Sequence, residues 1–380
     1  MTLKGQISPG FEAVSEAFLE GFASGREVGG ALAVYQAGEP LIDIWAGQTD
    51  RRKSVDWQAD TLVCCFSISK AITALVVAQA VDEGLIDLDK AVSHYWPEYQ
   101  GYGKEHTTVR HLFAHQAGLP GLKQPLVKDD LYDWHGFCAT LAAAEPWWQP
   151  GSAHGYHART FGFLLGEVLR RATGQTVAER LRQKVTGPLA CEFYFELSDE
   201  QMGRCADMIP AKIKPGAQAH WSDAMKAMAA DFTNPETVTG AAFQNPVMGP
   251  GYMNTDAFRQ ALIPAVNGHG TARALAEIMS KLPSLLSKEM LAEVATTQAH
   301  GPDEVLKSVT RFGLGFMLDE AQSPIGWPGC MGHAGAGGSI AFYDPASEIG
   351  FAYVMNQMQD GVVTGGTTAL ECIEVLRGLL

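Results

Sequence analysis

The sequence predicts an α+β protein built on one antiparallel sheet that helices flank. Five apolar runs have the length and pattern of strands, two near the start of the chain and three near its end: 31–37, 41–46, 312–318, 339–343 and 350–355. Helical patterns broken by proline and glycine fill the middle. We therefore expect residues 1–95 and 300–380 to form a discontinuous domain that holds the sheet, and residues 96–299 to form an inserted, mainly helical domain.

The beginning of the chain predicts a helix, a hairpin and a second helix. Four apolar residues at near-helical spacing indicate the first helix: Phe11, Val14, Phe18 and Phe22. The segment Gly38-Glu39-Pro40 favours a turn between the first two strands. A helical pattern resumes at Ser67 and ends before Gly84, where a left-handed cap costs little.

Further helices are expected in the middle of the chain: 108–115, 130–144, 160–172, 177–185 and 271–282. Thr271 stands at the start of the last of them, where it suits an N-cap. The segment 210–255 is rich in Gly, Pro and Asn and is expected to be irregular. Asp344-Pro345 predicts the turn between the last two strands, and a final helix is expected over 368–379.

Composition narrows the class of protein. The chain has 380 residues, of which 46% are hydrophobic and 18% charged, as in ordinary globular proteins. Its net charge of −14 disfavours a nucleic-acid partner, because an acidic surface repels phosphate. We expect no secretory signal, no membrane span and no membrane partner. Seven cysteines, two of them adjacent, fit reduced thiols and a cytoplasmic location.

Ser67-Ile68-Ser69-Lys70 is an SxxK sequence at the start of a predicted helix. Residues i and i+3 share a helix face, so the lysine amine can reach the Ser67 hydroxyl. The partial positive charge of a helix N-terminus favours an alkoxide and an oxyanion. Lysine accepts a proton only when it is neutral, and the apolar flanks 63–66 and 71–74 favour the burial that lowers its pKa. The alternative is a chance SxxK, with a capping serine and a solvated lysine.

Two glycine-containing segments accompany this sequence. Pro150-Gly151 predicts a turn that presents Tyr156 just before a new helix. Residues 332–339 carry glycines at a strand entry, which lets another backbone or a substrate approach closely. They do not form a phosphate loop, because neither GxxxxGK[ST] nor a strand–GxGxxG–helix context is present. Taken alone, each segment has an ordinary explanation. Tyr156 can be a tyrosine in a loop, and the glycines of 332–339 can form a tight turn or bulge.

Together these features resemble the serine β-lactamase and penicillin-binding-protein-like superfamily, and within it the class C β-lactamase-type carboxylesterases called family VIII esterases. The resemblance covers most of the chain in matching order and spacing. Four segments carry it: 66–89, 108–119, 150–175 and the glycine-rich strand entry at His333. It implies a β-lactamase/transpeptidase-like fold and a serine hydrolase that uses no metal and no cofactor.

The resemblance also implies roles for individual residues. Ser67 would be the acylated nucleophile, and Lys70 would share proton transfer with Tyr156. The backbone N–H groups of Ser67 and Ala336 would form the oxyanion hole, in which each donor is worth about 3 kcal/mol. His333-Ala334-Gly335 would replace the superfamily's Lys-Thr-Gly strand, so His333 and Gly335 are expected to bind substrate.

Two positions depart from the superfamily's pattern. Ala158 stands two residues after Tyr156, where an asparagine that contacts the acyl-amide of β-lactams is usual. His333 replaces a lysine, so a permanent charge for a substrate carboxylate gives way to one that is only partly present at neutral pH. Both departures, with a cytoplasmic location, favour esters over β-lactams or peptidoglycan.

Other residues are weighed against ordinary packing. His111 and His115 have the i, i+4 spacing of two metal ligands on a helix, but no third ligand is evident, so we expect structural or surface histidines. Trp148 lines the acyl pocket or packs in the core. Tyr252 and His269 lie in glycine-rich loops, from which they can face the cleft. Of these, Trp148 and Tyr252 are expected to contact substrate.

The sequence therefore predicts a hydrolase of small to medium carboxylic esters that works through an acyl-serine intermediate. Alternatives on the same fold are a β-lactamase, an amide hydrolase and a transacylase. A catalytically silent, penicillin-binding-like binding module is the alternative from another class. The intact set of Ser67, Lys70 and Tyr156 argues against that module.

Overall fold

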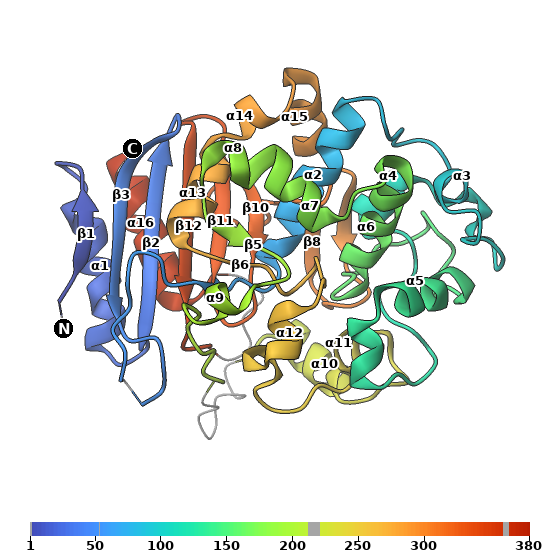
Figure 1. Cartoon of the computed structure of the whole chain (residues 1–380), viewed down its shortest axis with the longest axis horizontal. Helices are drawn as coiled ribbons and strands as arrows, with labels where there is room; N and C mark the ends of the chain where they lie inside the picture. Colours follow the sequence, from blue (N-terminus) through green and yellow to red (C-terminus); the bar gives the residue numbers. More distant parts are fainter. Residues whose placement is uncertain (1, 53, 212–220, 360–364) are drawn as a thin grey trace.

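One antiparallel sheet joins both ends of the chain, as predicted (Figure 1). The computed structural model describes residues 2–52, 54–211, 221–359 and 365–380. Within them the strands of the large sheet follow the order β1-β3-β2-β12-β11-β10-β9-β8-β7. Their bounds are β1 Lys4–Ile7, β2 Gly29–Gln36, β3 Glu39–Gly47, β7 Ala299–Pro302, β8 Val309–Phe312, β9 Met317–Leu318, β10 Met331–Ala334, β11 Ile340–Asp344 and β12 Ile349–Met355.

The junction between the two ends of the chain is the pairing of β2 with β12. These strands run antiparallel, with Leu32 opposite Tyr353 and Gly30 opposite Met355. The predicted hairpin forms beside them, because β2 also pairs with β3. Its turn lies at Ala37 and Gly38, both at positive φ, one residue earlier than the sequence indicates. The N-terminal hairpin and β1 thereby become part of a sheet whose other strands come from residues 299–355.

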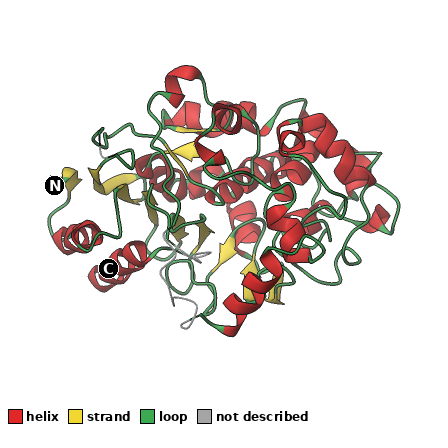
Figure 2. Ribbon diagram, turned by 90° about the horizontal axis from the view of Figure 1, so that it is seen from below, coloured by secondary structure: helices red, strands yellow, loops and turns green. Residues whose placement is uncertain are grey.

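Helices cover the two faces of the sheet. The long helices near the chain ends, α1 (Glu12–Ala23) and α16 (Thr367–Leu379), pack together on one face, where the Phe18 ring lies 6.1 Å from the Tyr353 ring (Figure 2). On the other face α13 (Ala272–Ser280) packs on β12 and β2. A side chain at Gly350 would overlap the Ala276 carbonyl there, so the close approach of α13 requires glycine.

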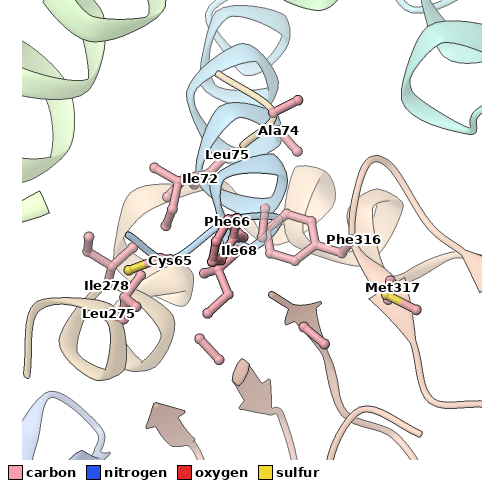
Figure 3. Close-up of a cluster of buried hydrophobic side chains, with 14 of the residues drawn as sticks. Cys65, Phe66, Ile68, Ile72, Ala74, Leu75, Leu275, Ile278, Phe316 and Met317 are labelled. Atoms are coloured by element: carbon pink, nitrogen blue, oxygen red, sulfur yellow. The ribbon is translucent and has the colours of Figure 1, made fainter. Parts of the chain in front are cut away.

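The helix that begins after Ser67 lies in the middle of the core. This helix, α2 (Ile68–Asp82), points Ile68, Ile72 and Leu75 toward the sheet, next to apolar side chains of α13 (Figure 3). It ends at Gly84, at φ 73°, as predicted. Its first turn is therefore held by packing on all sides, which gives the SxxK sequence a rigid support.

The remaining helices mostly connect the two halves of the sheet. Their bounds are α3 Val92–Tyr95, α4 Val109–Phe113, α5 Trp134–Ala143, α6 Thr160–Thr173, α7 Val177–Leu181, α8 Gly187–Leu189, α9 Asp199–Met202, α10 Asp223–Phe232, α11 Val238–Gln244, α12 Asp256–Gln260, α14 Leu282–Leu285 and α15 Lys288–Ala295. Short helical turns are η1 Lys104–His106, η2 Lys128–Tyr132, η3 Arg182–Thr186 and η5 Tyr252–Asn254. The expected N-cap at Thr271 is confirmed, because its side chain accepts a hydrogen bond from the Ala274 N–H.

Three expectations about elements were wrong in part. The run 312–318 is not one strand: β8 and β9 pair antiparallel around a turn that includes Gly313 and Gly315. The segment 210–255 contains α10 and α11, although 212–220 lies outside the described residues. The helix expected over 130–144 is divided at Asp133, whose carboxylate caps α5 by accepting from the Gly136 N–H.

A second, small sheet escapes sequence reasoning. It consists of β4 (Val63–Cys64), β6 (His269–Gly270) and β5 (Phe193–Tyr194), in that order. Strands of two residues are too short to show a period-2 pattern. This sheet ties the segment before Ser67 to residues some two hundred positions later.

The expected division into two domains stays a prediction. α13 belongs to the range 96–299, yet it packs on the large sheet. Among the described residues, no helix is both long enough and apolar enough to cross a bilayer.

Candidate active site

Ser67 sits where β4 passes into α2, at a strained turn. Phe66, just before it, has φ 45°, a left-handed conformation that costs a non-glycine residue of order 1 kcal/mol or more. Two hydrogen bonds hold the segment to the strand β6 region: Cys65 N–H donates to the Gly268 carbonyl at 2.8 Å, and Gly268 N–H donates to Ser69 Oγ at 2.9 Å. Ser67 itself is partly exposed while its neighbours are buried. The turn therefore presents one hydroxyl at the N-terminus of a buried helix.

Lys70 lies directly behind this hydroxyl. Its Nζ is 3.3 Å from Ser67 Oγ, 2.8 Å from the Ala158 carbonyl oxygen and 3.0 Å from the Ala265 carbonyl oxygen. The side chain is 0% exposed, and among the described residues no carboxylate pairs with it. Burial holds the pKa of Lys70 well below its usual 10.5, because an ammonium is poorly solvated there.

The three contacts of Lys70 determine which way a proton moves. A neutral amine has two N–H groups and one lone pair. Both carbonyls can only accept, so they take the two N–H groups. The lone pair is left for the Ser67 hydroxyl. This arrangement allows a neutral Lys70 to accept a proton from Ser67.

Tyr156 closes the other side of the serine. Its hydroxyl hydrogen-bonds with the Ser67 side chain, and its ring centroid lies 4.5 Å from Lys70 Nζ. Burial raises the pKa of Tyr156 above its usual 10, so the group stays a phenol at neutral pH. A phenol in this place can pass a proton between Ser67, Lys70 and a leaving group. The ring face can also stabilise Lys70 when the amine is protonated.

Asp303 holds Tyr156 in place, and sequence reasoning missed it. Its Oδ1 accepts hydrogen bonds from the backbone N–H of Tyr156 at 3.1 Å, and from those of Val305 and Leu306 at 2.8 Å each. Its Oδ2 accepts from the Thr310 hydroxyl at 3.2 Å. Nothing around Asp303 in the sequence distinguishes it from a surface loop residue. The role becomes visible only in the fold, which brings Asp303 next to Tyr156 although the two are 147 residues apart in the chain.

The glycine-rich segment lies against the nucleophile's strand. A Cβ at Gly335 would overlap the carbonyl oxygen of Cys65, two residues before Ser67. The N–H of Gly335 donates to the Ser339 carbonyl at 2.7 Å, which fixes the turn after β10. Ala336 follows this contact and is partly exposed, as Ser67 is. The predicted oxyanion pair, Ser67 N–H and Ala336 N–H, therefore belongs to two segments whose backbones touch.

Gly335→Ala tests this contact. The added methyl group must push the end of β10 away from Cys65, so the Ala336 amide moves relative to Ser67. We expect ester turnover to fall at least about tenfold, since sub-ångström to ångström shifts at a reacting centre cost one to two orders of magnitude. Initial rates of nitrophenyl ester hydrolysis measure the loss. Gly378→Ala is the matched control, because a Cβ there meets nothing within 4 Å. Equal activity of the two variants would contradict the role of the contact.

His333 is buried and neutral, which differs from the partial charge that the sequence suggests. Its side chain is 1% exposed, and burial together with nearby Lys70 lowers the pKa of His333 to about 3. Nδ1 lies 2.7 Å from the Ala334 carbonyl oxygen and must carry the hydrogen. Nε2 is then an acceptor, with no partner among the described residues. The ring centroid lies 5.9 Å from that of Tyr156.

The other residues expected at the cleft pack against neighbouring aromatic or histidine rings. Trp148 packs under the Tyr156 loop, with its ring against Gly155 and 6.2 Å from the His157 ring, so its place in an acyl pocket stays a prediction. Tyr252 stacks edge-on with Phe258 at 5.1 Å. His269 is buried in β6.

The two histidines with metal-ligand spacing do not act together. His111 uses Nδ1 to accept from the Thr108 N–H and so caps α4. His115 lies beyond the end of that helix at φ 59°, buried among aromatic rings. Its Nδ1 accepts from the His157 N–H at 3.1 Å. Both histidines are structural, as expected.

A partly exposed serine at a helix start, a desolvated lysine behind it and a buried tyrosine across from it define a serine hydrolase of the acyl-enzyme type. The sequence model of the Beta-lactamase family matches residues 14–371. The chain therefore belongs to the Beta-lactamase family, and the predicted β-lactamase/transpeptidase-like α+β fold is confirmed.

An esterase/beta-lactamase, a carboxylesterase and a penicillin-binding protein homologue are among the proteins similar to this chain. Esterase/beta-lactamase LipL of Mycobacterium tuberculosis is 33% identical over 384 residues, which cover 94% of this chain and 84% of LipL. The crystal structure of a family VIII carboxylesterase is 32% identical, covers both chains completely and has a TM-score of 0.90. That of a penicillin-binding protein homologue from Caulobacter crescentus is 33% identical, with complete coverage and a TM-score of 0.89. The predicted resemblance to family VIII esterases is thus confirmed.

Proposed function

We propose that this chain hydrolyses small to medium carboxylic esters, with Ser67 as nucleophile, Lys70 as base and Tyr156 as proton carrier. The observation that carries the proposal is the setting of Lys70, whose two carbonyl partners leave its lone pair for the Ser67 hydroxyl at 3.3 Å. A catalytically silent binding module has no need of a lysine kept neutral at such a desolvation cost.

The reaction follows from these contacts. The Ser67 hydroxyl proton moves to Lys70 as Oγ attacks the ester carbonyl carbon, and the N–H groups of Ser67 and Ala336 stabilise the oxyanion. When the tetrahedral intermediate collapses, the C–O bond to the alcohol breaks, and the proton returns from Lys70 through the Tyr156 phenol to the leaving alkoxide. Water then attacks the carbonyl carbon of the acyl-serine and gives its proton to Lys70. When the C–O bond to Ser67 breaks, that proton returns to Ser67 Oγ, and the acid leaves.

The surroundings of the serine favour esters over β-lactams. His333 stands where the superfamily has lysine, and its imidazole is neutral at every ordinary pH. Ala158 cannot offer a side-chain amide to an acyl-amide group. Esters also need less help from a proton donor, because an alkoxide leaves more readily than the amide anion that an unprotonated amide would release. Among the relatives, EstB of Burkholderia gladioli is named an esterase, whereas LipL is named for both esterase and β-lactamase activity.

His333→Lys tests substrate class. At pH 8 we expect the wild type to hydrolyse neutral short-chain nitrophenyl esters with a kcat/KM orders of magnitude above that for a chromogenic cephalosporin. A lysine at 333 adds a charge for the cephalosporin carboxylate, so the cephalosporin-to-ester ratio should rise about 5- to 30-fold, or 1–2 kcal/mol. The gain is modest because Ala158 still leaves the amide contact unmade.

The exposed His135 in α5 supplies the control, since His135→Lys adds the same charge away from the serine. A wild type that prefers the cephalosporin would favour the β-lactamase alternative. A ratio that moves equally in both variants would remove His333 as a specificity residue. No turnover of any ester by the wild type would favour the binding module.

We also propose a cytoplasmic location. All seven cysteines are free thiols, and five of them are buried. Free thiols in this number are typical of reducing compartments. Fractionation of the producing cell, with the chain detected by antibody, tests the location, and enrichment outside the cytoplasm would contradict it.

A further inference from the structure

Arg159 carries a half-buried positive charge that no carboxylate of the described residues neutralises. It follows Ala158 directly, at the start of α6. A guanidinium has five N–H donors. Arg159 Nη1 donates a hydrogen bond to the Pro246 carbonyl oxygen at 2.6 Å. Most of its donor capacity therefore remains for another group.

Two other buried arginines among the described residues are paired with carboxylates. Arg180 and Arg259, with side chains 3% and 9% exposed, pair with Glu83 and Asp207. Lys104 donates to two backbone carbonyls, those of Ala142 and Ala144. The setting of Arg159 is different, because burial disfavours its charge and lowers its pKa while only neutral tyrosines stand beside it. An anion that entered here would relieve the unpaired charge.

Arg159 is adjacent to the catalytic residues on one side. The carbonyl of Ala158, the residue before it, accepts the hydrogen bond from Lys70. The end of helix α11 contacts both residues. The Phe243 ring stacks on the Tyr156 ring at 6.3 Å, and the carbonyl of Pro246, three residues later, accepts the hydrogen bond from Arg159. Arg159 thus directly follows a residue that binds Lys70, and it lies three residues after Tyr156 in the chain.

Tyr252 connects Arg159 to the serine from the other side. Its phenol is close enough to Arg159 for a direct electrostatic interaction, and it remains neutral because burial raises its pKa. Its ring packs on Phe258, which in turn lies 6.4 Å from the ring of His269 in β6. Strand β6 pairs with β4, which leads into Ser67. Tyr252 is therefore linked to the segment before Ser67 through Phe258, His269 and the pairing of β6 with β4.

We infer that Arg159, together with the Tyr252 hydroxyl, binds a carboxylate carried by the ester substrate. The inference rests on the proposed ester hydrolysis and names its substrate class: half-esters, or esters of a carboxylate-bearing alcohol, with a few carbon atoms between the two functional groups. Arginine binds carboxylate through paired N–H groups, and the tyrosine adds a neutral donor. Because the whole chain carries a charge of −14, an anionic substrate is otherwise repelled, and a local cation is needed to hold it.

The test compares matched substrates. Mono-p-nitrophenyl glutarate carries a carboxylate on the acyl side, and p-nitrophenyl butyrate is its neutral counterpart. For the alcohol side, 4-carboxyphenyl butyrate is compared with phenyl butyrate. In Arg159→Gln we expect kcat/KM for one of the two anionic substrates to fall at least tenfold more than that for its neutral partner. Arg159→Lys should recover part of the loss. The substrate that responds identifies which side of the ester carries the charge.

Arg377→Gln is the control, because Arg377 is exposed on α16 and its removal changes the net charge equally. A second measurement needs no variant: glutarate should inhibit wild-type hydrolysis of p-nitrophenyl butyrate competitively, and more strongly than neutral dimethyl glutarate. Ratios that do not change in Arg159→Gln, or change equally in Arg377→Gln, would overturn the inference, as would equal inhibition by the two glutarates. These tests require that the wild type hydrolyses p-nitrophenyl butyrate. If it does not, the proposed function is refuted instead.

Discussion

Ser67→Ala should abolish ester hydrolysis while leaving the protein folded. The alanine removes the only atom that forms the acyl bond, so we expect kcat to fall at least about a thousandfold, the scale seen when a catalytic serine is removed elsewhere. Folding should be nearly unaffected, because Ser67 caps α2 without a side-chain capping hydrogen bond. Rates on nitrophenyl esters, together with the urea unfolding midpoint, measure both effects.

Ser152→Ala is the matched control for this variant. Its exposed hydroxyl belongs to the Tyr156-bearing segment but donates only to the Gln149 carbonyl. Intact mass after treatment with a fluorophosphonate should show one adduct on the wild type and on Ser152→Ala, and none on Ser67→Ala. A Ser67→Ala protein that keeps a tenth of the wild-type kcat would show that the nucleophile is another residue.

Lys70 and Tyr156 should each be needed for most of the rate. Lys70→Met and Tyr156→Phe remove one proton-transfer group apiece, and each should cost at least about a hundredfold in kcat/KM. The double variant should lose far less than the product of the two, because both groups act on the proton of Ser67. Full additivity would count against a shared path.

The pH dependence adds an independent measure of Lys70. A base works in its deprotonated form, so kcat/KM should rise with pH as Lys70 loses its proton. Because burial holds the pKa of Lys70 well below 10.5, the plateau should begin well below that pH. The acid limb should disappear from the residual activity of Lys70→Met. A wild-type rate still rising at pH 10.5 would mean that the amine is charged in the free enzyme.

Lys104→Met separates chemistry from stability in this experiment. Lys104 is as buried as Lys70 and also donates to two backbone carbonyls, but it lies beside Tyr99 and the end of α5. Its replacement should lower the free energy of unfolding by about 1–3 kcal/mol, since the carbonyls lose a charged donor. Its kcat/KM should stay near that of the wild type. Equal losses of activity in the Lys70 and Lys104 variants would indicate that Lys70 acts only through stability.

Local patterns in the sequence determined much of the scaffold of this site. Apolar spacing and a terminal glycine are enough to predict the helix from Ser67 to Gly84, since both are properties of one short segment. The i, i+3 relation then brings Lys70 to the serine without any knowledge of the fold. Tyr156 and the segment at His333 were found by resemblance to a family, and not by any local rule. Their roles remain predictions that the variants above test.

What the sequence alone could not determine is the charge state and support of these groups. Burial lowers the pKa of Lys70, and the carbonyls of Ala158 and Ala265, 88 and 195 residues away along the chain, accept hydrogen bonds from its amine. His333 is neutral for a similar reason, although its residue type suggests partial charge. The buried carboxylate of Asp303 and the unpaired guanidinium of Arg159 have no local signature. Protonation depends on desolvation and on partners brought together from distant segments, and only the tertiary structure decides both.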